Sequence, residues 1–394
     1  ANLSALCILV ANAWMQSPVG TTFNVETARQ EMTSFWDVVL SPVAINKFFH
    51  TVTSAYVLSA VVVVGISAWY LLRKREELFA RRSIVVASVF GLFFSLTAAM
   101  TGDGSAVQVA RTQPMKMEAL YDGREGAGLV AVGALRPVDR TVRTSDDSAF
   151  AFRIEIPKML SLMAFRDANA FVPGINDLVY GNEKYGIPST EQRMELGREA
   201  LEALEGYREA RQTGDEQEQA RFQKLFDPDD PAGKAFTEKQ FASIGYGFLK
   251  EPTDVVPNVP TVFYSFRVMV ALGGYFILLF AAILFFCYRR TLTGKRWMLY
   301  AMLWSIPLAY LASVSGWIVA EVGRQPWTIQ DLLPTVASVS KINTGSLITA
   351  FFLFVVLFTT LLIAELMIMT RQIRIGPEPP DAHAAQERTS IDNQ

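Results

Sequence analysis

Five long apolar runs dominate the hydropathy pattern of the chain. Each contains between 20 and 24 residues without Asp, Glu, Lys or Arg, and about 20 apolar residues cross the hydrocarbon core of a bilayer as a helix. A shorter run, Ala1 to about Met15, lacks an initiator Met and signal-peptide features, so we expect part of a span whose upstream helices lie outside this sequence. The five full runs predict transmembrane helices at Thr51–Leu72, Ser83–Gly102, Val268–Tyr288, Trp297–Ala320 and Ile342–Ala364.

Composition supports a membrane protein. Hydrophobic residues make up 51% of the chain and charged residues 19%, against about 25% charged residues in an average soluble domain. The net charge of −2 gives no basic field for nucleic acid. Cys7 and Cys287 lie far apart in apolar stretches, which argues against a disulfide framework or a zinc site.

The Lys and Arg residues orient the predicted bundle. They concentrate in the links Arg73–Arg82 and Arg289–Arg296 and at the C-terminal exit, which the positive-inside rule places in the cytoplasm. Glu321–Lys341 then lies outside. We predict four segments: a partial span plus two helices at 1–102, an extracytoplasmic loop at 103–260, three helices at 261–371 and a disordered cytoplasmic tail at 372–394.

The extracytoplasmic loop is too long for a bare connection and should fold on the membrane surface. Ser189–Phe226 alternates Glu and Arg and predicts one long polar helix, which begins with a capping box at Ser189 and Gln192. Pro and Gly cluster at Phe226–Gly233 and predict a turn.

Chemically active side chains gather at one predicted depth, near the outer surface. Imidazole and thioether are the axial ligands of many low-spin haems, and His50 and Met269 come from different helices at matching height. Arg267 could meet a haem propionate with its planar guanidinium, and the carboxylate of Glu321 could hold a high-spin iron. The remaining members of this set are Lys47 and Arg324.

Each of these residues also has a structural interpretation. His50 could be a hydrogen-bonded interface residue, and Met269 could simply fill the helix packing. Lys47, Arg267 and Arg324 could snorkel to the interface. Glu321 could pair with Arg324 three residues on, and Trp317 fits an interfacial aromatic belt.

Five motifs carry a resemblance to a known family. They occur in this order: SPVG at Ser17–Gly20, KFFHTVTSAYV at Lys47–Val57, TQPMKMEALYDG at Thr112–Gly123, FYSFRVMVALG at Phe263–Gly273 and GWIVAEVGRQPW at Gly316–Trp327. The set resembles subunit I of the cytochrome bd ubiquinol oxidases over nearly the whole chain, as its C-terminal two thirds. The resemblance implies an all-α, polytopic transmembrane bundle with a large extracytoplasmic quinol-binding loop.

The resemblance also implies roles for single residues. His50 and Met269 would be the axial ligands of a low-spin haem b, and Arg267 would neighbour that haem. Glu321 would ligate a high-spin haem b, and Trp317 would lie in the electron route. Arg324 would bind a haem propionate. Lys116 and Glu118 would form the quinol site.

The implied reaction oxidises ubiquinol or menaquinol at the outer face and reduces O₂ to water, without a proton pump. The high-spin site would contain a further haem, either haem d or a third haem b. The chain would act in a bacterial inner membrane with a second membrane subunit, with or without a small accessory subunit.

Two departures from the family pattern bear on this assignment. The family has more helices in this subunit than the five found here, and Lys116 and Glu118 are two residues apart instead of the family's wider spacing. Three alternatives remain open: a secondary transporter using Arg267 and Glu321, a structural subunit without a cofactor, and a non-functional fragment. No role follows from the sequence for Lys47, Asp103 or Glu365.

Overall fold

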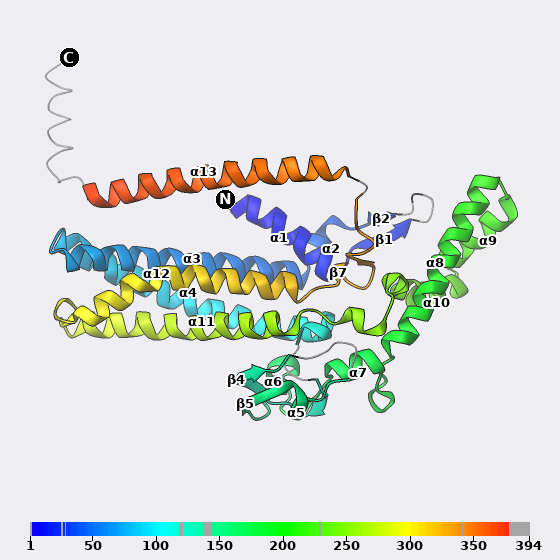
Figure 1. Ribbon diagram of the computed structural model, residues 1–394, viewed down its shortest axis with the longest axis horizontal. Helices are drawn as coiled ribbons and strands as arrows, with labels where there is room; N and C mark the ends of the chain where they lie inside the picture. Colours follow the sequence, from blue (N-terminus) through cyan, green and yellow to red (C-terminus); the bar gives the residue numbers. More distant parts are fainter. Residues whose placement is uncertain are drawn as a thin grey trace, which may run out of the picture. The chain divides into compact units, whose positions relative to one another are not determined.

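The computed structural model describes residues 2–24, 27, 29–117, 121–137, 143–227, 230–340 and 342–377. Five helices are long and apolar enough to cross a membrane, which confirms the five predicted spans and the all-α bundle (Figure 1). They are α3 (Pro42–Leu72), α4 (Glu77–Thr112), α11 (Val259–Tyr288), α12 (Arg296–Val322) and α13 (Thr344–Ile375).

These helices extend beyond the apolar runs that predicted them. For example, α4 has 36 residues, about 54 Å of helix at 1.5 Å per residue, whereas a hydrocarbon core is about 30 Å thick. The extra turns therefore project from the membrane. Several of the polar side chains discussed below lie on such end turns, among them Asp103 near the end of α4.

Shorter elements fill the rest of the described chain. The α-helices are α1 (Asn2–Gln16), α2 (Phe35–Val39), α5 (Asp146–Ala149), α6 (Met159–Phe165), α7 (Ile175–Tyr180), α8 (Thr190–Thr213), α9 (Glu216–Phe226) and α10 (Pro231–Lys239). The 3₁₀ helices are η1 (Pro114–Met117), η2 (Glu183–Tyr185), η3 (Phe241–Phe248), η4 (Pro252–Val255) and η5 (Leu292–Gly294).

Strands form only small antiparallel pairs in the described chain. The longest pair, β4 (Leu129–Leu135) with β5 (Phe150–Ile156), is a hairpin in the large loop. The others are β1 (Thr21–Asn24) with β2 (Arg29–Met32), β3 (Arg124–Glu125) with β6 (Phe171–Val172), and β7 (Trp327–Ile329) with β8 (Leu333–Pro334).

The chain divides into two compact units, and the division cuts through four of the long helices. The second unit contains the remaining parts of those helices and α13. The first unit holds all the side chains discussed as a site below; it consists of Ala1–Leu58, Gly91–Leu278 and Pro307–Val339, and the second of Ser59–Phe90, Leu279–Ile306 and Ser340–Gln394.

Small residues allow close helix packing inside the second unit. A Cβ atom at Gly65 of α3 would lie 2.7 Å from the side chain of Ile306 in α12, so the two helices meet where a side chain is absent. Tyr70 Oη donates to the carbonyl of Ile373 in α13 at 2.7 Å. The side chains of α13 itself are not buried against the described chain.

The predicted polar helix is two helices. Its start is confirmed: Ser189 is the N-cap of α8 and forms the capping box with Gln192. Its continuity to Phe226 is wrong, because Gly214 ends α8 with φ +74° and the side chain of Asp215 caps the N-terminus of α9. A left-handed glycine followed by an aspartate is a strong stop-and-start signal.

Helix α8 packs against η3 without intervening side chains at one point. A Cβ at Gly197 would lie 2.4 Å from the carbonyl oxygen of Ser243 and 2.5 Å from the amide nitrogen of Gly247. Backbone atoms cannot swing aside, so glycine is required for this close approach.

We therefore expect Gly197→Ala to destabilise the loop by about 1–3 kcal/mol through overpacking. The unfolding temperature of the loop in the purified protein measures the change, with protease cleavage within the loop as the readout of unfolding. Gly294→Ala is the matched control because its Cβ would meet nothing within 4 Å. Equal unfolding temperatures for the two variants would contradict the close approach.

Candidate functional site

The imidazole of His50 is fixed by a threonine of the neighbouring helix. His50 Nδ1 lies 2.9 Å from Thr101 Oγ1 of α4. The hydroxyl of Thr101 donates to the carbonyl of Thr97 at 3.0 Å, so its oxygen is left to accept a hydrogen bond from the N–H of Nδ1. This tautomer puts the lone pair on Nε2, the nitrogen a metal would use.

The thioether of Met269 lies against a glycine of α12. A Cβ at Gly316 would be 3.1 Å from Met269 Sδ, so any larger residue would displace the sulfur. One turn further along α11, a Cβ at Gly273 would meet nothing within 4 Å. The described residues therefore leave α11 uncovered one turn beyond Met269.

The carboxylate of Glu321 is held on both oxygens at the end of α12. Oε1 accepts from Asn12 Nδ2 at 2.8 Å, and Oε2 contacts Arg324 Nη2 at 2.8 Å. Lys47 Nζ donates to Asn12 Oδ1 at 2.9 Å. Asn12, Lys47, Glu321 and Arg324 form one polar cluster, which we call the Glu321 cluster; the pairing of Glu321 with Arg324 expected from their spacing is present.

Two buried donors, one of them in this cluster, find no acceptor among the described residues. They are Arg324 Nε and the indole Nε1 of Trp14 in α1. Arg324 Nη1 donates to the carbonyl of Thr328 at 3.0 Å, so its guanidinium is otherwise well held. Buried donors without a partner are rare, and an anionic group such as a haem propionate fits the Arg324 position.

Lys116 connects the motif Thr112–Gly123, which we call the quinol-loop motif after the family resemblance, to the same end of α12. Its Nζ donates to the carbonyl of Ala320 at 3.0 Å and to Gln16 Oε1 at 3.3 Å. Gly323 leaves room for its stem, since a Cβ there would lie 3.0 Å from Lys116 Cγ. The other predicted quinol-site residue, Glu118, lies outside the described residues.

A pocket beside Lys116 contains a buried polar network that the sequence analysis missed. Tyr246 Oη donates to Asp331 Oδ1 at 2.8 Å and accepts from Arg193 Nη1 at 2.9 Å. Gln330 Nε2 donates to the same carboxylate oxygen at 3.0 Å and accepts through Oε1 from Gln113. Lys116, Tyr246, Trp327 and Asp331 all line this pocket.

Burial changes the acid–base behaviour of this network. Removal from water raises the pKa of the Asp331 carboxyl above its usual range, against the lowering effect of the Tyr246 hydrogen bond. Burial likewise raises the pKa of the Tyr246 phenol. Asp331 is thus a carboxyl group that titrates closer to neutrality than an exposed aspartate.

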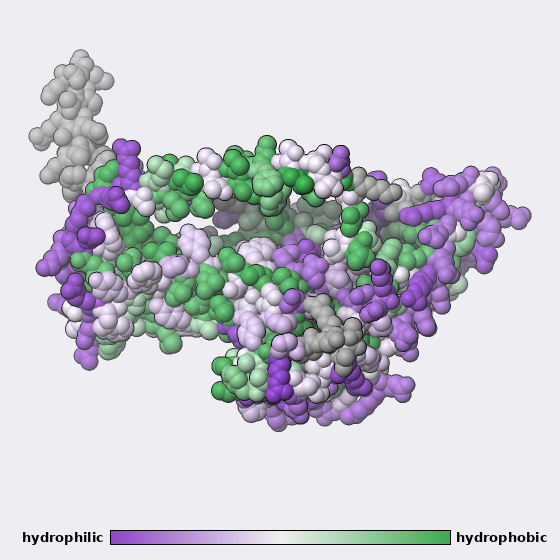
Figure 2. Space-filling model, in the orientation of Figure 1, coloured by the Kyte–Doolittle hydropathy of each residue, from purple (hydrophilic) through white to green (hydrophobic). Residues whose placement is uncertain are grey.

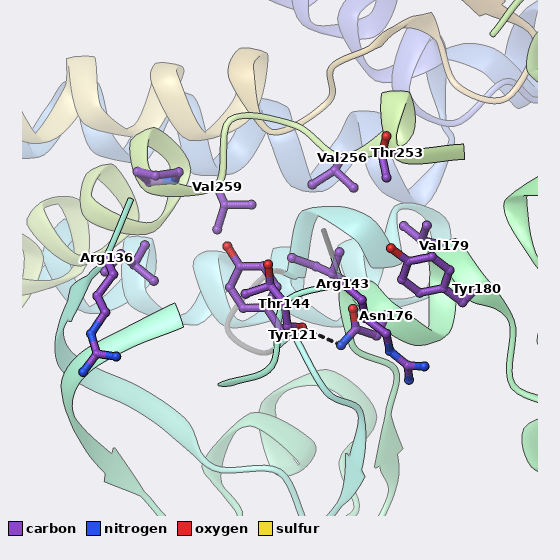
Figure 3. A pocket seen from close by; sticks show the side chains of 13 residues that line it. Tyr121, Arg136, Arg143, Thr144, Asn176, Val179, Tyr180, Thr253, Val256 and Val259 are labelled. Carbon is purple, nitrogen blue, oxygen red and sulfur yellow. Dashed lines mark hydrogen bonds between the residues drawn. The ribbon is translucent and has the colours of Figure 1, made fainter. Parts of the chain in front are cut away.

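A second pocket lies within the large loop (Figure 3). The amide of Asn176 donates to the carbonyl of Thr144 at 2.7 Å, and the guanidinium of Arg143 lies 5.3 Å from the ring centre of Tyr180. None of the residues predicted for the site lines this pocket.

The remaining predicted residues have mainly structural contacts. Arg267 donates through Nε and Nη2 to the carbonyl of Val130 and lies 3.3 Å over the ring of Phe263, so its place beside a haem remains a prediction. Trp317 is 42% exposed. Asp103, which had no predicted role, pairs with Arg166.

Comparison with known proteins identifies the family. The profile described as cytochrome bd terminal oxidase subunit I matches residues 1–377. The chain is 37% identical to cytochrome bd-II ubiquinol oxidase subunit 1 of Escherichia coli (strain K12) over 387 residues, covering 95% of this chain and 71% of that one. It is 28% identical to cytochrome bd ubiquinol oxidase subunit 1 of Bacillus subtilis (strain 168), covering 97% of this chain and 67% of that one.

The fold agrees with this result. The structure of the bd oxidase from Geobacillus thermodenitrificans superposes with a TM-score of 0.67 at 23% identity, covering 95% of this chain and 68% of that chain. The five candidate spans mark an integral membrane protein. The chain therefore belongs to the cytochrome bd terminal oxidase subunit I family.

Proposed function

We propose that this chain binds and oxidises a membrane quinol and passes its electrons to haem groups held by its own helices. One observation carries the proposal: Lys116, from the quinol-loop motif, donates to the carbonyl of Ala320, the residue next to Glu321. The group proposed to hold quinol and the carboxylate proposed to hold a haem are thus neighbours.

The quinol head group would occupy the pocket that Lys116 shares with Asp331. Lys116 can donate to a quinone oxygen, and the carboxylate of Asp331 can accept a hydroxyl proton. Gln113 and Gln330 continue from that carboxylate as a chain of hydrogen bonds. Glu118, two residues from Lys116, would be a further proton acceptor.

The donor set on α3 and α11 suits haem. His50 through Nε2 and Met269 through its sulfur would hold a low-spin haem b, with Arg267 beside it. When bound, such a haem accepts single electrons at a potential that thioether ligation raises. Thr101 keeps the His50 tautomer, and Gly316 keeps room for the Met269 sulfur.

Glu321 and Arg324 would serve the high-spin site. Each carboxylate oxygen of Glu321 retains lone-pair capacity beyond its one contact, so the group can bind iron while Asn12 and Arg324 orient it. The Nε donor of Arg324 would meet a propionate, and Trp317 would lie between the haems. A high-spin haem b with a haem d or a further haem b would form the O₂-reducing site.

The distribution of Lys and Arg indicates which side of the membrane each segment faces. With Lys- and Arg-rich links in the cytoplasm, the loop 103–260 and the Lys116 pocket lie on the outer face of a bacterial inner membrane. Quinol protons are then released outside. A second membrane subunit would complete the oxidase, whose quinol is ubiquinol or menaquinol.

Replacement of the thioether tests the haem assignment. We expect Met269→Leu to lower the midpoint potential of the low-spin haem or to loosen it, because an apolar side chain cannot ligate iron. Redox titration of the visible spectrum measures this. His50→Ala should abolish the low-spin band, and Met298→Leu, a buried methionine outside the site, should change nothing. An unaltered spectrum and potential in Met269→Leu would refute ligation.

Removal of the Lys116 ammonium should weaken quinol binding. A hydrogen bond from a charged donor contributes about 1.5–3 kcal/mol, so we expect Lys116→Ala to raise the KM for quinol by at least about tenfold. Quinol-dependent O₂ uptake measures it. Lys239→Ala, an exposed lysine on α10, is the control; an unchanged KM in Lys116→Ala would exclude contact with quinol.

The pH profile tests Asp331 as the proton acceptor. Only the carboxylate accepts a proton, so the rate should fall as pH falls through the raised pKa of Asp331. We expect Asp331→Asn to lower kcat by about 100-fold and to remove this acid limb.

Tyr246→Phe provides the second variant for that test. Loss of the phenol hydrogen bond, which lowers the pKa of Asp331, should shift the acid limb to higher pH without removing it. A wild-type pH profile in both variants would contradict the assignment.

A further inference from the structure

The β4–β5 hairpin and α6 share an outward surface that is apolar. We call this surface the hairpin face. Figure 2 shows a hydrophobic area where Figure 1 places β4 and β5. Its six members are between 36% and 60% exposed: Val132, Phe152, Ile154, Ile156, Met159 and Leu162.

The charges of β5 lie on the opposite face. Arg153 Nη1 pairs with Asp146 at 2.9 Å, and Glu155 pairs with Arg124. Val130 and Phe150 are buried there. A hairpin surrounded by water shows the reverse pattern, with its polar alternate residues outward. The alternation in β5 therefore indicates an apolar environment outside the hairpin.

Hydrogen bonds hold the hairpin against α11 at one depth in the membrane. Arg267 Nη2 donates to the carbonyl of Val130 at 2.8 Å, and the amide of Leu135 donates to Tyr264 Oη at 2.9 Å. Arg267 directly precedes the 21 uncharged residues Val268–Tyr288, which at 1.5 Å per residue fill about 30 Å of hydrocarbon. The hairpin is thus level with the boundary between hydrocarbon and lipid head groups.

Exposed cations border the hairpin face. Arg136 follows β4 directly, and Lys158 stands two residues after β5; both are exposed. Lys158 Nζ donates to Asn169 as well. On the opposite face, the carboxylates of Glu155 and Asp146 are already paired with arginines. An apolar surface with a cationic border matches anionic lipid head groups over acyl chains.

We propose that the hairpin face is inserted into the interfacial layer of the lipid bilayer beside α11. The loop is then attached to the membrane surface at a third place, in addition to its two ends. The inference is independent of the proposed function, because it concerns only the lipid contact of the loop.

The test uses the oxidase with its partner subunit, reconstituted in nanodiscs of phosphatidylethanolamine and phosphatidylglycerol. Bimane is attached at Ile154→Cys, in a background with Cys7→Ser and Cys287→Ser, and the background protein serves as the blank. Glu202→Cys, on the exposed polar side of α8, is the matched control. Phe152→Cys repeats the measurement if Ile154→Cys fails to assemble.

We expect bimane at position 154 to lose emission to lipids carrying a nitroxide near the head group, and to resist aqueous iodide. Position 202 should show the opposite. Two results would overturn the proposal: quenching at 154 by iodide alone, which places the face in water, or quenching by neither agent, which means that a protein subunit covers it.

Discussion

The carboxylate of Glu321 is the group on which the candidate site depends. It lies at the end of α12 between the amide of Asn12 and the guanidinium of Arg324, and Asn12 in turn accepts from Lys47. A partly buried carboxylate is costly unless its oxygens are hydrogen-bonded and its charge is balanced. Residues from α1, α3 and the turn after α12 meet that requirement together, so three distant segments of the chain come together at this carboxylate.

Lys116 extends the same arrangement toward the large loop. Its ammonium caps the carbonyl of Ala320 and reaches Gln16 of α1, so the quinol-loop motif begins in contact with the helices. The loop then packs against the link that follows α12, where the rings of Tyr246 and Trp327 lie with their centres 4.8 Å apart. The residues proposed for quinol and those proposed for haem are therefore parts of one compact unit.

The helices could be predicted from the sequence because hydropathy over 20 residues is a local property. The capping box at Ser189 is local too, and it was found. The break at Gly214 was missed because alternating Glu and Arg continue on both sides of it. Asp331 and Tyr246 are 85 residues apart, so no local pattern could join them. Asn12 is a local signal that could have pointed to the site, because it is a polar residue inside the apolar run of α1.

For the site residues too, local sequence signals predict the residue, whereas its contacts depend on distant parts of the chain. His50, Met269 and Glu321 stand out as chemically active residues near the ends of the apolar runs, and family motifs contain them, but their partners depend on packing between helices. That packing is what pairs His50 with Thr101 and Met269 with Gly316. The partners of Arg267 could not be predicted from its residue type, because its donors reach the backbone carbonyls of Val130 and Phe263.

The attachment of the hairpin to α11 has a mechanical consequence. Arg267 and Tyr264 fasten the loop to the helix turn that also bears Met269. Biological electron tunnelling slows steeply with each added ångström between donor and acceptor. Under the proposed function, in which Met269 ligates the haem that receives the electron, these two bonds would hold the loop at a fixed distance from that ligand while lipids and substrate exchange around it.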